Sequence, residues 1–226
     1  MIPIDSLLSD ILFGFTALIS IINPIGVAFV FYDRTSALTE EARRMIARRV
    51  AIYALFVLLV AFFAGAPVLH FFGISIEALR IGGGLAVAVA GWQMLNAPDA
   101  PAPGAHQSVT RVDPELAVQK AFFPLTIPLT TGPGSIATAI ALTANRGHFK
   151  LSEYLLSAMA SVVISVLVMV VIYLVYSRSA RLAHYLGVNG MRVALRVSSF
   201  LLLCIGVQIV LTGVQGFLAP LVGVPG

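Results

Sequence analysis

Charged residues are scarce in this 226-residue chain: Asp, Glu, Lys and Arg together make up 11% of it, while 59% of the residues are hydrophobic. A soluble domain carries about a quarter charged residues, so this chain has too little polar surface to cover itself in water. The mean hydropathy of +0.97 agrees with that reading. We therefore expect the chain to lie in a lipid bilayer.

Other absences narrow the function. A single cysteine, Cys204, excludes an internal disulfide framework. The first ten residues contain no Lys or Arg, whereas a cleavable signal peptide begins with basic residues, so we expect the first apolar run to be retained as a helix.

No Asp or Glu falls inside the long apolar runs, which argues against a proton relay through a buried carboxylate. The four histidines show no spacing of metal or haem ligands, and no Ser–His or paired-Asp arrangement occurs at matching depth. We expect no cofactor, no metal site and no enzyme.

Charge-free stretches divide the chain into six apolar runs, which cover residues 11–32, 50–76, 81–98, 121–145, 154–177 and 197–226. A membrane-spanning helix needs about 20 apolar residues. The sequence therefore predicts an all-α, polytopic membrane protein with six transmembrane helices. Hydroxyl residues beside an acid predict helix N-caps at three places, Thr39-Glu40, Ser75 with Glu77, and Ser152-Glu153.

Lys and Arg are distributed unequally among the loops. The loops after the first, third and fifth runs hold 11 of them and the other loops hold 3. Basic loops stay in the cytoplasm, so we expect both termini in the periplasm. This asymmetry accounts for the net charge of +4 without a nucleic-acid partner. Residues 97–119 contain four prolines and are expected to be a cytoplasmic linker between two domains, residues 1–96 and 120–226.

The two halves resemble each other at a nearly constant spacing. Four matches lie 109 to 116 residues apart: Pro24 with Pro133, Leu38-Thr39-Glu40 with Leu151-Ser152-Glu153, Leu79-Arg80-Ile81 with Leu195-Arg196-Val197, and Gly91-Trp92-Gln93 with Gly206-Val207-Gln208. Each half has an odd number of spans, so the pattern predicts two inverted three-helix repeats, an arrangement typical of secondary transporters. Chance similarity between apolar helices is the alternative.

Prolines interrupt the first and fourth runs near their centres. Proline removes an N–H group and clashes with the carbonyl four residues back, so we expect helices 1 and 4 to be broken near mid-membrane. Such breaks expose half-helix N-termini for a carboxylate and leave carbonyls and hydroxyls for an ammonium group. The expected substrate-binding residues are Asn23, Pro24, Gly26, Thr126, Thr130, Thr131, Gly132, Pro133, Gly134 and Ser135. Two ordinary proline kinks are the alternative.

Four further polar residues lie toward the ends of spans. Arg80 and Arg196 begin the third and sixth spans, where arginine commonly extends to the membrane interface, and a secondary contact with the substrate is the alternative. Gln93 and Gln208 are expected to pack between helices, with a gate contact as the alternative. Gly84, Ala88 and Gly91 share one face of the third span, and we expect this face to let another helix pack closely.

The stretches NPIG (23–26), FGISIEALRIGGGLAVAVAGWQML (72–95), AFFPLTIPLTTGPGSIA (121–137) and CIGVQ (204–208) resemble the MarC family over all six spans. The resemblance implies a six-helix protein of the bacterial inner membrane. Relatives are classed as neutral amino-acid transporters, which implies a small neutral amino acid as the substrate and agrees with a zwitterion at the broken helices.

Two function classes stay open at this point. The first is a secondary transporter for a small zwitterionic solute, with H⁺ or Na⁺ as the coupling ion and with a homo-oligomer allowed. Any coupling ion would use carbonyls, hydroxyls or groups at the rim, so we expect transport to survive neutralisation of Asp10, Asp33 or Glu77 one at a time. The second class is a non-transporting membrane scaffold or a lipid-handling protein.

The unequal distribution of basic residues leads to a topological prediction. A cysteine introduced at Ala105 should resist a membrane-impermeant thiol reagent added to intact cells, whereas cysteines placed near either terminus should react. Ready labelling at Ala105 with none at the termini would reverse the predicted orientation. The measurement needs a Cys204→Ala background, so that only the introduced thiol is detected.

Overall fold

The computed structural model describes residues 4–36, 38–96, 121–144 and 151–222, and every element in these ranges is a helix. The expected linker over residues 97–119 lies outside the described residues. The elements in chain order are α1 (Ile4–Ile22), α2 (Pro24–Arg34), α3 (Glu40–Phe71), α4 (Ile76–Leu95), the π-helix η1 (Ala121–Thr130), α6 (Pro133–Ala144), α7 (Leu151–Ser177) and α8 (Ser179–Val222).

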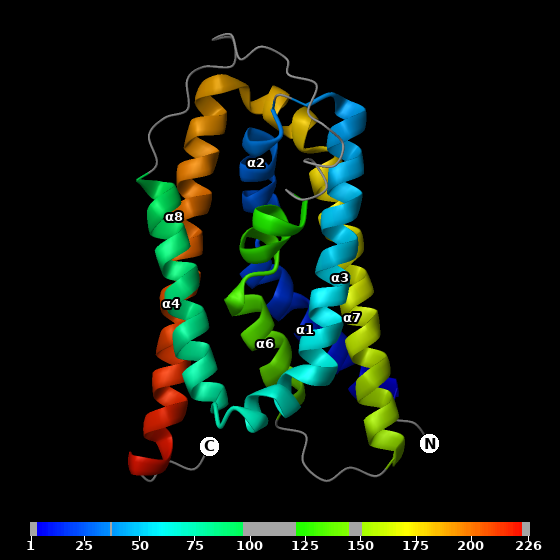
Figure 1. The fold of residues 1–226 in the computed structure, drawn as a ribbon, viewed down its shortest axis with the longest axis vertical. Helices are drawn as coiled ribbons and strands as arrows, with labels where there is room; N and C mark the ends of the chain where they lie inside the picture. The colour runs from blue at the N-terminus through cyan, green and yellow to red at the C-terminus, as the bar shows by residue number, and fades with distance from the viewer. Residues whose placement is uncertain (1–3, 37, 97–120, 145–150, 223–226) are drawn as a thin grey trace.

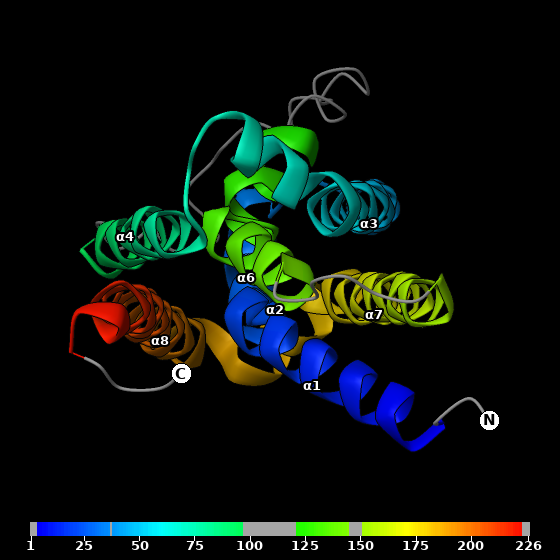
Figure 2. The ribbon, with the colours of Figure 1, turned by 90° about the horizontal axis from the view of Figure 1, so that it is seen from below.

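The helices form a central group flanked by two pairs (Figure 1). Helices α4 and α8 pack together on one side, and α3 and α7 pack together on the other. The short helices α2, η1 and α6 lie between these pairs, and α1 runs from this centre outward past α7, as the view from below shows (Figure 2). Helix α1 begins and α8 ends at the same, lower end of the molecule in Figure 1.

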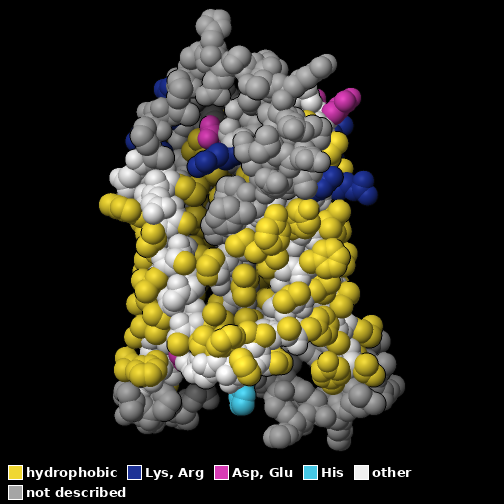
Figure 3. Space-filling view, viewed as in Figure 1, with side chains coloured by type: hydrophobic (Ala, Val, Ile, Leu, Met, Phe, Trp, Pro, Cys, Tyr) yellow, Lys and Arg dark blue, Asp and Glu magenta, His cyan; other side chains and the backbone are white. Residues whose placement is uncertain are grey.

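Five helical segments are long and apolar enough to cross a membrane: Leu7–Arg34, Glu40–Phe71, Ile76–Leu95, Tyr154–Ser177 and Arg192–Ala219. In Figure 3 hydrophobic side chains cover most of the described surface between the two ends, and Lys and Arg side chains gather toward the upper end. This distribution suits a lipid environment around the middle of the molecule.

The six expected spans are therefore not all present as single long helices. The run 121–145 folds as η1 and α6, of ten and twelve residues, and each is too short to cross a membrane alone. The physical reason is proline: Pro133 cannot continue the hydrogen bonding of the preceding helix and instead begins a new one. The first run is also divided, since α1 ends at Ile22 and α2 begins at Pro24.

Two of the three expected N-caps are confirmed. The hydroxyl of Thr39 accepts a hydrogen bond from the Ala42 amide at 3.3 Å, and that of Ser75 accepts one from the Ala78 amide at 3.1 Å. The third expectation is wrong, because Ser152 lies inside α7, which already includes Leu151. Caps of this kind fix where α3 and α4 begin.

The core lies where the central helices meet α3 and α7. Its largest fully buried side chains include Leu18 of α1, Phe31 of α2, Leu58 of α3, and Ile172 and Tyr176 of α7. These residues come from α1, α2, α3 and α7. The central helices are thereby held against α3 and α7 by side-chain packing.

Small residues hold α4 against α8, as the sequence predicts. A Cβ atom at Gly84 would lie 2.7 Å from the carbonyl oxygen of Gly206, and one at Gly91 would lie 2.9 Å from that of Ser199. A Cβ at Gly206 would in turn collide with the backbone nitrogen of Ala88. The two backbones therefore touch directly, which only glycine at these positions allows.

This packing yields a prediction about stability. Gly84→Leu should separate α4 from α8 and cost about 1–3 kcal/mol or more of stability, the usual cost of overpacking. The control is Gly82→Leu, because a Cβ at the exposed Gly82 would meet nothing within 4 Å. Thermal unfolding of the purified proteins in detergent measures both. Equal unfolding temperatures for the two variants would contradict the close α4–α8 contact.

Candidate functional site

The break between α1 and α2 is built around Asn23. This residue has φ 45° and ψ 59°, in the left-handed region that Asn tolerates better than most residues. Its side-chain oxygen accepts a hydrogen bond from the Gly26 amide at 3.3 Å, and its carbonyl accepts one from the Val27 amide at 2.9 Å. Pro24, which has no N–H group to satisfy, follows as the first residue of α2.

This geometry corrects one expectation from the sequence. We expected free amides at the start of α2 to receive an anion, but the Gly26 amide is already paired with Asn23. The amide nitrogen Nδ2 of Asn23 is the donor that remains on this side chain. It lies close to Gly26, since a Cβ built there would be 2.5 Å from Nδ2 and 2.8 Å from the hydroxyl oxygen of Ser198.

The second break lies between η1 and α6. In η1 the hydroxyls of Thr126 and Thr130 donate to the carbonyls of Ala121 and Leu125, each five residues earlier and 2.7 Å away. Thr131 continues this register, because its amide donates to the Thr126 carbonyl at 2.8 Å and its hydroxyl to the same carbonyl at 3.3 Å. A π-helix has this i to i+5 spacing, and it often marks a functional site.

These bonds correct a second expectation. The hydroxyls of Thr126, Thr130, Thr131 and Ser135 were expected to face an ammonium group, yet each donates its hydrogen to a backbone carbonyl, Ser135 to that of Gly132 at 2.9 Å. All four residues are at most 2% exposed. None of the four hydroxyls is therefore accessible from outside in this conformation.

The two breaks lie side by side at the centre of the molecule. A Cβ at Gly134, the second residue of α6, would be in ordinary contact with the Ile21 side chain, 3.5 Å away, at the end of α1. Gly83 of α4 faces the same junction, since a Cβ there would lie 3.0 Å from the Pro133 carbonyl oxygen. Gly26 itself faces Ser198 of α8 and not the η1–α6 break.

Gly26 and Gly134 are both closely packed. Beyond Ile21, a Cβ at Gly134 would lie 2.8 Å from the Val87 side chain and 3.1 Å from that of Ile209. No open space for a larger side chain exists at either glycine, so leucine there would push helices apart and would not merely fill a cavity. Pro24 and Gly132 are buried too, and Asn23 and Pro133 are half-buried.

The four secondary candidates lie away from this centre. Gln93 and Gln208 are exposed, so the expectation that they pack between helices is wrong. Arg196 is exposed, and Arg80 is half-buried with its Cβ atom beside Gly213 of α8. Among the described residues, no group of three His, Cys, Asp or Glu side chains could hold a metal ion.

Tyr176 is a central residue that the sequence analysis missed. It is fully buried at the end of α7, its ring stacks on Phe31 of α2 with centroids 4.7 Å apart, and its hydroxyl lies 3.0 Å from that of Thr130. Because Thr130 donates its own hydrogen to Leu125, Tyr176 is the donor to Thr130. One side chain thereby connects α2 and η1. The sequence signal that could have identified Tyr176 is a tyrosine within an otherwise apolar run.

A second missed residue, Arg43, closes the same end of the molecule. It is only 7% exposed, and its guanidinium donates to the Thr35 hydroxyl, the Thr35 carbonyl and the Leu38 carbonyl at 3.1 to 3.3 Å. The group also lies over the Tyr32 ring, 4.9 Å from its centroid. The sequence analysis counted Arg43 only as a loop charge, but it fixes the end of α2 to α3.

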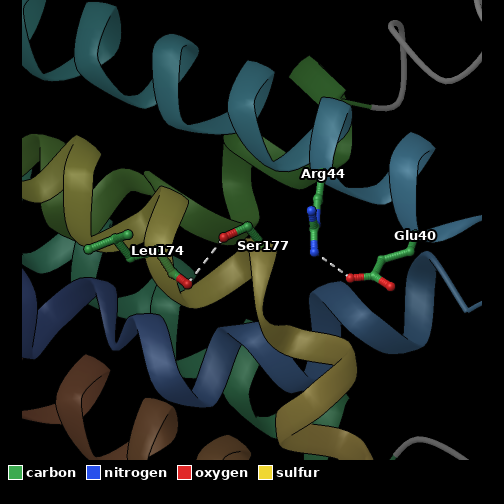
Figure 4. Close-up of polar contacts among 4 residues, drawn as sticks. All are labelled: Glu40, Arg44, Leu174 and Ser177. Atoms are coloured by element: carbon green, nitrogen blue, oxygen red, sulfur yellow. Dashed lines mark hydrogen bonds and ion pairs between the residues drawn. The ribbon is translucent and has the colours of Figure 1, made fainter.

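Two polar contacts near this end lie on the surface and play no part in the site (Figure 4). Arg44 and Glu40 of α3 form an exposed ion pair at 2.6 Å, and Ser177 donates to the Leu174 carbonyl of α7 at 3.3 Å. Each contact stays within one helix. Exposed pairs of this kind contribute little to stability.

The Tyr176 contact predicts a measurable loss. Tyr176→Phe keeps the stacking on Phe31 but removes the bond to Thr130, so the stability should fall by about 0.5–1.5 kcal/mol, the usual net worth of a buried hydrogen bond. Tyr173→Phe is the matched control, since Tyr173 lies on the same helix and is 39% exposed. Thermal unfolding in detergent compares the two. A Tyr176→Phe protein as stable as the control would show that this bond contributes nothing.

Comparison with known proteins places the chain in a family. The model of the MarC family, described as integral membrane proteins, matches residues 8–218. Proteins named inner membrane protein MarC from the Escherichia coli strains O1:K1, UTI89 and K12 are each 31% identical over 206 residues, which cover 89% of this chain and 92% of theirs. No solved structure matches the chain. The chain therefore belongs to the MarC family of integral membrane proteins.

Proposed function

We propose that this protein is a multi-pass inner-membrane secondary transporter for a small neutral amino acid, bound where the α1–α2 and η1–α6 junctions meet. The observation that carries the proposal is the packing of α6 against the end of α1, where a Cβ at Gly134 would lie 3.5 Å from the Ile21 side chain, because this packing brings two interrupted helices together. Interrupted helices at membrane depth are tolerated where protein or a wet cavity surrounds them, and transporters use them to bind solutes.

The contact between α4 and α8 supports two inverted repeats, residues 1–96 and 120–226, joined by the linker 97–119. At a spacing of 115 residues, Gly91 corresponds to Gly206 and Gly84 to Ser199. A twofold axis would convert the Gly84–Gly206 contact into a contact of Ser199 with Gly91, and both contacts occur. This reciprocity reflects the antiparallel packing of α4 and α8, the relative direction that the last helices of two inverted three-helix repeats would have. On this basis η1 and α6 together are the fourth of six spans.

The proposed orientation places both termini in the periplasm. Helix α1 begins and α8 ends at the lower end of the molecule, while Lys and Arg gather at the upper end (Figures 1 and 3). The positive-inside rule assigns the upper end to the cytoplasm. The Tyr176 and Arg43 contacts then close the cytoplasmic side, so the described conformation is closed toward the cell interior.

Binding of a zwitterion at the junction has a definite chemistry. The Asn23 amide and the Ser198 hydroxyl, which converge on Gly26, can donate to a carboxylate. The lone pairs of the Thr130 and Thr131 hydroxyls, whose hydrogens are already donated to carbonyls, can accept from an ammonium group. Because Thr130 and Thr131 are buried and Asn23 and Ser198 are half-buried, binding requires α1 and α6 to separate first.

The experiment is uptake and counterflow of a panel of labelled neutral amino acids in proteoliposomes. Asn23→Asp keeps the oxygen that caps Gly26 but replaces the amide donor with a negative charge, so the KM for a carboxylate-bearing solute should rise by about tenfold or more. Asn96→Asp is the matched control, since Asn96 is exposed at the end of α4.

Two outcomes would count against the proposal. If the wild-type protein moves none of these solutes at any imposed gradient, it is not this kind of transporter, and the scaffold or lipid-handling alternative takes its place. If transport occurs but Asn23→Asp behaves like Asn96→Asp, the solute binds elsewhere.

A further inference from the structure

A small cavity lies near the lower end of the molecule, away from the proposed solute site. It measures about 20 Å³, and its polar lining comes from Asp10 of α1, Thr143 of α6 and Ser161 of α7, with Phe62 of α3 among its apolar neighbours. A cavity needs about 10–15 Å³ to hold one water molecule. The space therefore suits a single small occupant between three helices.

Asp10 stands directly before the first apolar run, near the exposed start of the candidate membrane span Leu7–Arg34, and it lines the cavity. It is the one charged residue among the described residues that line this cavity.

The hydrogen bonds of the two hydroxyls decide what the cavity can hold. Ser161 donates its hydrogen to the Ser157 carbonyl at 3.0 Å. Thr143 donates to carbonyls of its own helix and of Phe62, the closest at 3.1 Å and the Phe62 oxygen at 3.3 Å. With these hydrogens committed, both hydroxyls offer lone pairs, and a carboxylate offers only acceptors. The polar lining therefore favours an occupant that needs only acceptors, either a cation or a water molecule that donates both of its hydrogens.

The charge of the cavity lining and its number of oxygen atoms narrow the choice of occupant. Calcium takes 6–8 oxygen ligands, commonly from several carboxylates, and magnesium keeps much of its water shell. One carboxylate and two hydroxyls suit a singly charged ion better than a divalent one. We propose that Asp10, Thr143 and Ser161 form a binding site for Na⁺.

The site is placed to couple the ion to the solute. Asp10 lies in the helix that ends beside Asn23, and Thr143 lies in the helix that begins at Pro133. An ion shared by α1, α6 and α7 holds together the outer halves of the two interrupted helices, the parts that separate to admit solute. This coupling role rests on the proposed transport, whereas Na⁺ binding itself does not.

The test measures binding without transport. Thermal unfolding of the purified full chain in detergent is followed as NaCl replaces choline chloride at constant ionic strength and pH. A site that binds Na⁺ only in the folded state should raise the unfolding temperature saturably. Asp10→Asn should abolish the rise, whereas Asp33→Asn, on the exposed far end of the same span, should keep it.

A second pair of variants separates binding from folding. Ser161→Ala should raise the half-saturating Na⁺ concentration by roughly tenfold through loss of one ligand. Ser165→Ala is the matched control, because Ser165 is a buried serine one turn further along α7 that also donates to a carbonyl four residues back and does not line the cavity. Equal Na⁺ responses in this pair would overturn the site.

The remaining outcomes are equally decisive. No saturable Na⁺ response in the wild-type protein, or a response to pH alone, would refute the sodium site and leave the transport proposal standing. Saturable Na⁺ binding that depends on Asp10, together with no solute uptake in proteoliposomes, would support the site and refute the transport proposal.

Discussion

The rest of the structure depends on how an interrupted backbone satisfies its polar groups where water is scarce. Proline at positions 24 and 133 begins new helices in the middle of apolar runs, and unsatisfied backbone groups in hydrocarbon cost several kcal/mol each. The chain resolves this locally. Asn23 turns through the left-handed region and caps Gly26, while the threonines of η1 return their hydroxyl hydrogens to carbonyls five residues earlier.

The same constraint explains the arrangement of the helices. Interrupted helices are safest when other protein surrounds them, and the central group is enclosed by the α3–α7 pair on one side and the α4–α8 pair on the other (Figure 2). Close approach is possible because glycine stands at the contacts. Gly83 lets α4 reach Pro133, and Gly84 and Gly206 bring the backbones of α4 and α8 together.

The two ends of the central group are held differently. At the upper end, Tyr176 and Arg43 bind α2, η1 and the residues after α2 through direct hydrogen bonds and ring contacts. At the lower end, α1 and α6 meet around a small polar cavity with one carboxylate. Buried, satisfied contacts are costly to open, so under the proposed transport we expect the lower end to move first.

The sequence by itself determined the membrane class, five of the expected spans, two helix caps, the small-residue face of α4 and the positions of the two proline breaks, because composition, length and proline act locally. It did not determine what the freed polar groups bind. Only the tertiary structure decided that the hydroxyls of Thr126 and Thr130 turn back to their own backbone, that Gly26 faces Ser198, that Gln93 and Gln208 are exposed, and that Tyr176 and Arg43 are buried. The physical reason is that a side chain's partner depends on which helix face lies opposite, and that is fixed by packing between segments far apart in the chain.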